Sequence, residues 1–288
     1  TKWFNVIVLF NYDRLRLNKT DIMDLALNGK TALITGGSKG IGFGIAEALT
    51  QEGTNLAICA RHKNELEQAA NQLRQSGGEV VAVPTDLTKS GDIDELLVKV
   101  NDTFDSIDIL VNNAGTIGQN GSFVDTPLEE WRSLFEVNLF AVVELTQKVL
   151  PQMQEQGWGR IINVSSENGT QPYPDMIHYS ASKGALDNFS KALSKQYASD
   201  GILVNTISPA FIETPLVDSM MQSMADEQGV SKQTMIKQFL DEKRPHLQLK
   251  RPGTIEEVGA VVAFLASEKA SFINGSNYRI DGGSVAAE

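Results

Sequence analysis

The sequence TALITGGSKGIG, residues 31–42, predicts the fold more strongly than any other stretch of this chain. Its first five residues carry no charge and predict a buried strand, and the glycines that follow allow a tight turn into a helix over residues 41–52. Gly36, Gly40 and Gly42 would let the backbone approach a pyrophosphate, while the first helical turn would supply N–H donors and positive potential. A turn without a ligand is the alternative, and the strand–turn–helix context disfavours it.

Short apolar runs alternate with longer amphipathic segments from residue 30 onwards. Runs rich in Val, Ile and Leu are typical of strands covered on both faces, and their alternation with helices implies right-handed crossovers. We therefore predict a single-domain α/β fold, a Rossmann-type doubly wound parallel sheet of seven strands with a helical substrate lid. The predicted strands are 31–35, 55–60, 79–86, 107–115, 159–166, 202–210 and 278–283, and the predicted helices are 41–52, 63–76, 91–104, 127–155 and one that contains Tyr179.

Residues 29–288 are predicted to form this domain, and residues 1–28 an extension that lacks the alternating pattern. The extension is interpreted as disordered, or as a strand or a partner contact, and Met23 could be the original start. The apolar run at residues 3–10 matches a secretory signal only weakly, because no cleavage pattern of small residues follows it.

Residues 211–253 interrupt the alternation, and they are longer than an ordinary connection and have helical periodicity of their own. Long excursions at the carboxyl end of a strand are typical of functional lids. Four of the seven methionines lie here, and they would either anchor the lid or form an adaptable apolar wall for a substrate. These four are Met220, Met221, Met224 and Met235.

Charge and cysteine content exclude several classes of function. The formal net charge is −11, from 25 Lys and Arg against 36 Asp and Glu, which disfavours nucleic acid and anionic membranes as main partners. The single cysteine, Cys59, excludes an intrachain disulfide and suits a reducing compartment, so a cytoplasmic location is expected. No apolar run approaches the roughly 20 residues that span a bilayer, and no metal site is expected.

The end of the second predicted strand bears on the choice of cofactor. Sites for NAD usually have an acidic residue there, whereas this chain has Arg61. Arg61 and Lys39, which lies within the glycine turn, could pair with a 2′-phosphate, although either could instead be a solvated charge. We therefore predict NADP(H). Asp86 and Leu87 would lie beside an adenine ring.

Tyr179 and Lys183, in the sequence YSASK, are four residues apart and would lie on one face of a helix. An ammonium beside a phenol favours the phenolate, so Lys183 is expected to lower the pKa of Tyr179 from about 10 towards the operating pH. Such a pair also occurs by chance on surface helices. A chance pairing is disfavoured here by two further residues, Ser166, thirteen residues before the tyrosine, and Asn138, forty-one before it.

With these residues together, the chain resembles the short-chain dehydrogenase/reductase family, in its shorter, non-extended branch. The resemblance covers about residues 28–285 and is carried by TGGSKGIG, NNAG, Asn138, Ser166, YSASK and the terminal NGSNYRIDGG. Bacterial 3-oxoacyl-carrier-protein reductases and related carbonyl reductases with a longer lid are the most similar members.

The resemblance implies four catalytic residues. Tyr179 would be the general acid in reduction and the general base in oxidation, while Lys183 would hold the nicotinamide ribose. Ser166 would polarise the substrate carbonyl, and Asn138 would bind a water that links Lys183 to solvent. A core asparagine bonded to nearby backbone is the alternative for Asn138, because a buried amide needs partners in either case.

The predicted contacts with the cofactor extend from the glycine turn to the lid, and Thr214 would contact the nicotinamide carboxamide. The family usually has Pro-Gly after the sixth strand, but this chain has Pro209-Ala210, and alanine tolerates positive φ poorly. The predicted cofactor-binding residues are Gly36, Ser38, Lys39, Gly40, Ile41, Arg61, Asp86, Leu87, Asn113, Ala114, Gly115, Tyr179, Lys183, Pro209, Ile212 and Thr214.

The predicted substrate-lining residues are Asn168, Tyr173, Met176, Phe211 and Met220. His178 is more typical of packing than of catalysis. The basic segment at residues 243–251 would be either a solvated charge cluster or a receiver for an anionic substrate or carrier.

The predicted function is NADP(H)-dependent interconversion of a carbonyl and a secondary alcohol, in the reductive direction, on an apolar or acyl substrate such as a 3-oxoacyl thioester. An NAD-dependent alcohol, sugar or steroid dehydrogenase is the alternative enzyme. A non-catalytic nucleotide-binding protein is a further alternative, which the complete set of catalytic residues disfavours. The resemblance also implies a homo-oligomer, a tetramer or a dimer.

Overall fold

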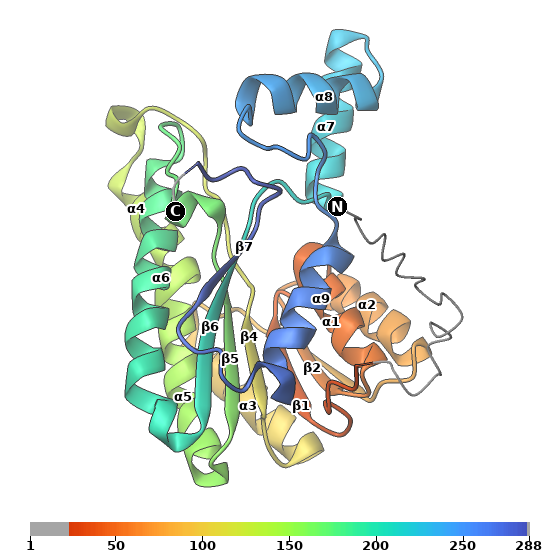
Figure 1. Cartoon of the computed structure of the whole chain (residues 1–288), viewed down its shortest axis with the longest axis vertical. Helices are drawn as coiled ribbons and strands as arrows, with labels where there is room; N and C mark the ends of the chain where they lie inside the picture. Colours follow the sequence, from red (N-terminus) through yellow and green to blue (C-terminus); the bar gives the residue numbers. More distant parts are fainter. Residues whose placement is uncertain (1–22, 287–288) are drawn as a thin grey trace, which may run out of the picture.

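A computed structural model describes residues 23–286, and its centre is one twisted sheet of seven parallel strands (Figure 1). The strand order is β3-β2-β1-β4-β5-β6-β7, which confirms the predicted doubly wound sheet. The strands are β1 Thr31–Thr35, β2 Asn55–Ala60, β3 Val80–Pro84, β4 Ile109–Asn112, β5 Gly159–Val164, β6 Ile202–Pro209 and β7 Asn277–Ile280.

Helices cover both faces of the sheet, which explains why the central strands are apolar throughout. Every residue of β1, β4 and β5 is buried. One face packs against α1 Gly40–Gln51, α2 Lys63–Gln75 and α9 Ile255–Ala266, and the other against α3 Ser90–Phe104, α5 Ala141–Gln156 and α6 Ile177–Tyr197. Within the described residues, no helix is long and apolar enough to cross a membrane.

The predicted helix over residues 127–155 consists of two helices joined by a π-helical turn. These are α4 Leu128–Phe135, the turn Glu136–Phe140 and α5. The predicted strand over residues 107–115 is also shorter, because β4 ends at Asn112 and the NNAG sequence leaves the sheet there. Both differences fall beside predicted catalytic or cofactor residues.

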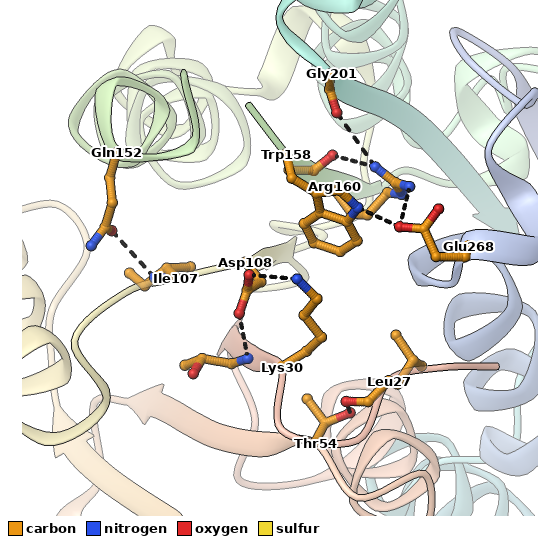
Figure 2. A network of polar contacts seen from close by, with 12 residues as sticks. Leu27, Lys30, Thr54, Ile107, Asp108, Gln152, Trp158, Arg160, Gly201 and Glu268 are labelled. Atoms are coloured by element: carbon orange, nitrogen blue, oxygen red, sulfur yellow. Dashed lines mark hydrogen bonds and ion pairs between the residues drawn. The ribbon is translucent and has the colours of Figure 1, made fainter. Parts of the chain in front are cut away.

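Where the strands begin, a network of polar contacts joins residues from neighbouring strands and from the segment after α9 (Figure 2). The Trp158 ring packs against two cations, Lys30 Nζ at 3.9 Å and Arg160 Cζ at 4.2 Å from the ring centroid. Lys30 also forms an ion pair with Asp108, and Glu268 contacts both Trp158 and Arg160. Cation–π contacts of this kind stabilise the fold where the cations are partly desolvated.

The packed part of the chain begins a little before the predicted boundary at residue 29. Leu27 is buried in the main core, and its carbonyl accepts hydrogen bonds from Lys30 N and Thr54 Oγ1. Of the predicted extension, residues 1–22 lie outside the described residues.

The lid is a pair of helices, α7 Pro215–Gln228 and α8 Lys232–Lys243, beyond the carboxyl end of β6 (Figure 1, top). A single parallel bridge between Ile212 and Gly253 closes its base. The lid has a small core of its own, formed by Phe211, Met221, Ala225, Met235, Leu240 and Leu247. Two of the four methionines therefore anchor the lid, while Met220 is 40% exposed.

Candidate active site

The glycine turn after β1 is packed too tightly for larger residues. The amides of Gly36 and Gly37 both donate to the Cys59 carbonyl at the end of β2. A Cβ at Gly42 would lie 2.3 Å from the Gly36 carbonyl oxygen and 2.4 Å from Asn113 Nδ2. The turn therefore holds the amino end of α1 close to the edge of the sheet.

This amino end of α1 has the features of an anion site. Lys39 is its N-cap residue with no side-chain cap, and the first turn contains no acidic residue. Unsatisfied N–H groups and the positive end of the helix dipole favour a phosphate at such a position. Gly36, Ser38, Gly40 and Ile41 lie at this end, as the sequence predicts, so the turn fits the pyrophosphate of a dinucleotide.

The two predicted cations lie at the neighbouring end of β2. Arg61 is exposed, while Lys39 Nζ forms an ion pair with Glu65 Oε2 at 3.0 Å. The hydrogen bond from Lys39 lowers the pKa of Glu65. Arg61 is thus available to an anionic group directly, whereas Lys39 is shared with an acidic neighbour.

Asp86 and Leu87 follow the end of β3. Asp86 accepts hydrogen bonds from the amide and the hydroxyl of Thr88, at 3.2 and 2.8 Å, and these lower the pKa of its carboxyl. Its own amide donates to Asp92 Oδ2 at 3.0 Å. Leu87 packs on the core beneath, so both residues are fixed at the edge where the adenine is predicted.

The NNAG sequence connects the glycine turn to the predicted catalytic residues. The amides of Asn113 and Ala114 both donate to Thr35 Oγ1 at 2.9 Å, and Asn113 Nδ2 donates to the Thr35 carbonyl at 2.8 Å. A Cβ at Gly115 would lie 3.2 Å from Asn138 Oδ1 and 3.6 Å from Lys183 Nζ. Gly115 therefore adjoins both side chains.

Asn138 is fully buried in the π-helical turn, and both ends of its side-chain amide are hydrogen-bonded. Its Oδ1 accepts from Thr116 N, and its Nδ2 donates to the Thr116 carbonyl and to Ser182 Oγ, at 2.8, 2.8 and 3.1 Å. These bonds match the sequence alternative of an asparagine bonded to nearby backbone. π-Turns are frequent at functional sites, and this one joins the NNAG segment to α6.

Tyr179, Lys183 and Ser166 come together at the carboxyl end of β5. Lys183 Nζ donates to the Val164 carbonyl at 2.8 Å and lies 5.8 Å from the centroid of the Tyr179 ring. Ser166, the second residue after the strand end, forms a side-chain hydrogen bond with Tyr179 and accepts from Asn168 N at 3.3 Å. The three side chains that the sequence predicts as catalytic therefore share one site.

Burial has the largest influence on the ionisation of this site. It raises the pKa of Tyr179, the Ser166 hydrogen bond lowers it, and the charge of Glu167 raises it further. Burial also lowers the pKa of Lys183 to about 8, against the opposing effect of Asp187. In the protein alone, the pKa of the tyrosine is therefore shifted upward, which differs from the expected lowering by the lysine.

The predicted substrate residues fall into two groups. Asn168, Tyr173 and Met176 lie between Ser166 and α6, and Asn168 Nδ2 contacts Met176 Sδ at 3.6 Å. Phe211 belongs to the lid core, where it stacks on Phe239 with ring centroids 5.0 Å apart. The exposed Met220 is thus the lid member of this set that remains open to a ligand.

The remaining predicted cofactor residues lie where β6 enters the lid. Pro209 ends the strand, Ile212 forms the lid-base bridge, and Thr214 Oγ1 caps α7 by accepting from Val217 N. Ala210 does not adopt positive φ, and its amide donates to the Ile280 carbonyl at 3.1 Å. Alanine at this position therefore causes no strain.

Three residues near the site were missed by sequence analysis, namely the buried Glu167 and the partly buried Arg244 and Asp187. Glu167, 2% exposed, accepts a hydrogen bond from Tyr173 at 3.0 Å and lies 3.4 Å from Arg244 Nε in an ion pair. The Arg244 guanidinium lies over the Tyr173 ring at 4.2 Å. Within the basic segment 243–251, Arg244 is thus partly buried rather than solvated. His178 is also buried, against Trp131, as a packing residue.

The comparisons agree with this geometry. A family profile described as short chain dehydrogenase matches residues 30–225. The chain is 34% identical over 255 residues to the 3-oxoacyl-[acyl-carrier-protein] reductase FabG of Staphylococcus epidermidis, and the alignment covers 88% of this chain and 98% of that one. The chain belongs to the short-chain dehydrogenase family. It is therefore an oxidoreductase that acts on carbonyl or alcohol substrates.

Two solved structures of the family contain different nicotinamide cofactors. L-Sorbose reductase from Gluconobacter frateurii, complexed with NADPH and L-sorbose, has a TM-score of 0.88 and 34% identity, and the match covers 92% of this chain and 100% of that one. An NAD+-bound xylitol dehydrogenase has a TM-score of 0.81 and 30% identity, with coverage of 90% and 100%. Short-chain dehydrogenases of this fold thus bind either nicotinamide cofactor. Within residues 23–286, no group of three metal-ligating side chains occurs.

Proposed function

We propose that this protein is an NADP(H)-dependent oxidoreductase that interconverts a carbonyl and a secondary alcohol, with reduction as its working direction. The observation that carries the proposal is the convergence of Ser166, Tyr179 and Lys183, with Lys183 Nζ next to Gly115 at the end of the NNAG segment. A bound nicotinamide supplies the hydride. Every other task falls to residues of this chain.

Tyr179 holds the proton that the substrate oxygen receives, and Ser166 hydrogen-bonds and polarises that oxygen. Lys183 holds the ribose hydroxyls and places a positive charge beside the tyrosine. Asn138 would hold a water that links Lys183 to solvent; its Nδ2 is fully bonded to Thr116 and Ser182, while its Oδ1 accepts one bond from Thr116 and can accept another.

The preference for NADP(H) rests mainly on Arg61. It is exposed at the end of β2, where a guanidinium can pair with a 2′-phosphate. Lys39 supports the same preference less strongly, because Glu65 competes for its ammonium.

Cofactor preference is tested by Arg61→Gln, with Lys99→Gln, an exposed lysine on α3, as the matched control. We expect kcat/KM for NADPH to fall by about tenfold or more, the value of one charge-assisted contact, with little change for NADH. A wild-type protein that prefers NADH, or an Arg61 variant that loses both cofactors equally, would contradict the assignment.

The substrate proposed from the sequence is apolar or acyl, such as a 3-oxoacyl thioester. Support from the lid is limited to Met220 and the partly buried Met224, since Met221 and Met235 belong to the lid core. A screen of NADPH oxidation against 3-oxoacyl thioesters, free ketones, aldehydes and ketoses tests it. The same proposal includes a homo-oligomer, a dimer or tetramer, in the cytoplasm.

A further inference from the structure

The helix that carries Tyr179 and Lys183 has a third ionisable group on the same face. Asp187 follows Lys183 by four residues, as Lys183 follows Tyr179, so the three side chains lie one turn apart along α6. Tyr179 and Lys183 are both accounted for by the reaction, whereas Asp187 has no role in it so far.

The Asp187 carboxyl is enclosed by the segment that follows β5. Its Oδ1 is buried and has no hydrogen-bond partner among the described residues, and the nearby Ser165 hydroxyl, which donates to the Lys183 carbonyl at 3.4 Å, lowers the pKa of this carboxyl. A Cβ at Gly169 would lie 2.4 Å from Asp187 Oδ2, so only glycine allows this approach. The carboxyl therefore adjoins both the catalytic helix and the loop that carries Ser166.

An unpartnered carboxyl oxygen in such a place is costly unless a nearby charge offsets it. Two lysines of α6 lie four residues from Asp187. Lys183 is the one whose charge lowers the pKa of this carboxyl, and its Nζ donates to the Val164 carbonyl rather than to Asp187, whereas Lys191 Nζ donates to the Gly275 carbonyl. The interaction between Lys183 and Asp187 is thus electrostatic, across one helical turn, and not a direct ion pair.

We propose that Asp187 is a positioning residue for the reaction, whose carboxylate keeps Lys183 in the ammonium form and orients the loop that carries Ser166. This inference rests on the proposed function, because it assigns Asp187 a role only through Lys183 and Ser166. Lys183 must carry a charge to hold the ribose and to assist the tyrosine.

The pKa shifts of Asp187 and Lys183 agree with this role. Burial lowers the pKa of Lys183 to about 8 and the charge of Asp187 opposes this, while burial raises the pKa of Asp187 to about 6 against the effects of Ser165 and Lys183. Between these values the ammonium and the carboxylate coexist, and this range includes neutral pH.

Other charged groups near α6 are less well placed than Asp187 to keep Lys183 in the ammonium form. Glu167 in the segment Glu167–Gly169 is already paired with Arg244, and Glu130 in α4 accepts from the Gln119 amide. The strand β6, which packs against α6, contains no charged residue. The charged groups that remain on the packed elements and on α6 itself are Glu129, Arg132, Glu136, Lys191, Lys195 and Asp200.

The test is Asp187→Asn, which keeps the size of the side chain and removes its charge. We expect the alkaline limb of the kcat/KM profile for the carbonyl substrate, at saturating NADPH, to move down by about one pH unit. Asp187→Glu is expected to restore most of the wild-type profile. Glu155→Gln, an exposed acid on α5, is the matched control and should leave the profile unchanged.

Folding is not expected to obscure the result. Because the pKa of Asp187 lies above its unfolded value, ionising this carboxyl costs folding free energy as the pH rises through about 6. The neutral amide avoids this cost, so the asparagine variant should be at least as stable as wild type at pH 7.5. Should it fail to fold, Asp187→Ser is measured in its place, with the same limb shift expected.

The possible outcomes separate this inference from the proposed function. If Asp187→Asn or Asp187→Ser folds but its alkaline limb does not shift, the proposed role of Asp187 is wrong. The proposed function would still stand in that case, provided that Tyr179→Phe is inactive in the same assay. The role of Asp187 is also wrong if Asp187→Asn shifts the alkaline limb but Asp187→Glu does not restore it, because the negative charge at this position would then not be the cause of the shift. If Tyr179→Phe stays active, the proposed function itself fails.

Discussion

At the scale of single residues, the site combines a partly buried tyrosine, Tyr179, and a buried lysine, Lys183, whose pKa values shift in opposite directions. Burial disfavours the charged form of each, so it raises the pKa of Tyr179 and lowers that of Lys183 to about 8. Both shifts make the neutral phenol and a readily titrated lysine available near neutral pH. Reduction needs the protonated tyrosine, so the upward shift suits the working direction that we propose.

Gly42→Ala tests the tight packing of the glycine turn. A Cβ there would lie within 2.4 Å of the Gly36 carbonyl oxygen and of Asn113 Nδ2, so we expect a loss of about 2 kcal/mol in unfolding free energy and weaker NADPH binding. Gly91→Ala, in α3 with nothing within 4 Å, should instead stabilise by about 0.5–1 kcal/mol. Urea denaturation and NADPH fluorescence titration measure both effects. Equal stability of the two variants would contradict the packing argument.

The sequence indicates which residues share the site more readily than it indicates their environment. The spacing of Tyr179 and Lys183 predicted that they share one face of a helix, because helix turns have fixed geometry, and the family resemblance added Ser166. Glu167 and Asp187 escaped prediction, because nothing in a single sequence separates an enclosed carboxylate from a solvated one. An acidic residue directly after Ser166, and another four residues after Lys183, were the available signals.

At the scale of elements, an ion pair joins the lid to the catalytic loop. Arg244 follows the end of α8, and Glu167 directly follows Ser166, so their contact fixes one end of the lid beside the reaction site. The contact at 3.4 Å lacks hydrogen-bond geometry at Arg244 Nε, and Glu167 Oε2 has no partner among the described residues. The pair is therefore held mainly by charge and by the stacking of Arg244 on Tyr173.

Arg244→Gln is expected to lower the unfolding free energy by about 3 kcal/mol, because it leaves the Glu167 carboxylate buried without its cation. The KM for the carbonyl substrate should rise, while the affinity for NADPH should stay within about twofold, well under 1 kcal/mol. Urea denaturation and steady-state kinetics measure these quantities. Lys243→Gln, at the preceding exposed position, is the control.

Glu167→Gln combined with Arg244→Gln completes a double-mutant cycle. The double variant should recover at least about 1 kcal/mol relative to the sum of the single losses, because no uncompensated charge remains. Additive losses would show that the two residues act independently and that the lid is held by other contacts.

Element boundaries were predicted less well than element types. The helix over residues 127–155 was expected to be continuous, but the turn Glu136–Phe140 is π-helical. The side chain of Asn138 bonds to Thr116 and Ser182, which are distant in sequence, so local pattern could not reveal why the helix widens there. The strand over residues 107–115 ended early for a similar reason, since Asn113 and Ala114 bond to Thr35 instead of continuing the sheet.

At the scale of the whole molecule, stability and chemistry lie at opposite edges of the sheet. The predicted catalytic residues follow strand ends, whereas the network around Trp158 lies at the strand beginnings (Figure 2). The fold class, the number of strands and the lid could be predicted because alternation and the glycine turn specify them, whereas the strand order comes from the structure. The network could not, because Lys30, Trp158 and Glu268 come from separate parts of the chain.

Trp158→Leu tests this separation. It removes two cation–π contacts and the hydrogen bond to Glu268, so we expect the unfolding free energy to fall by about 2 kcal/mol. Turnover below the melting temperature should not change, because the catalytic edge is untouched. Phe272→Leu, at a fully exposed position, should alter neither quantity. A Trp158 variant with wild-type stability would show that the network does not stabilise the fold.

The most direct test of the central claim is the rate of NADPH oxidation by Tyr179→Phe with a carbonyl substrate accepted by the wild type. Tyr197→Phe, at the far end of the same helix, is the control. The account predicts that Tyr179→Phe binds NADPH as wild type does and loses about 10²–10⁴-fold in turnover, the value of a positioned general acid. A folded Tyr179→Phe protein that turns over at the wild-type rate would contradict it.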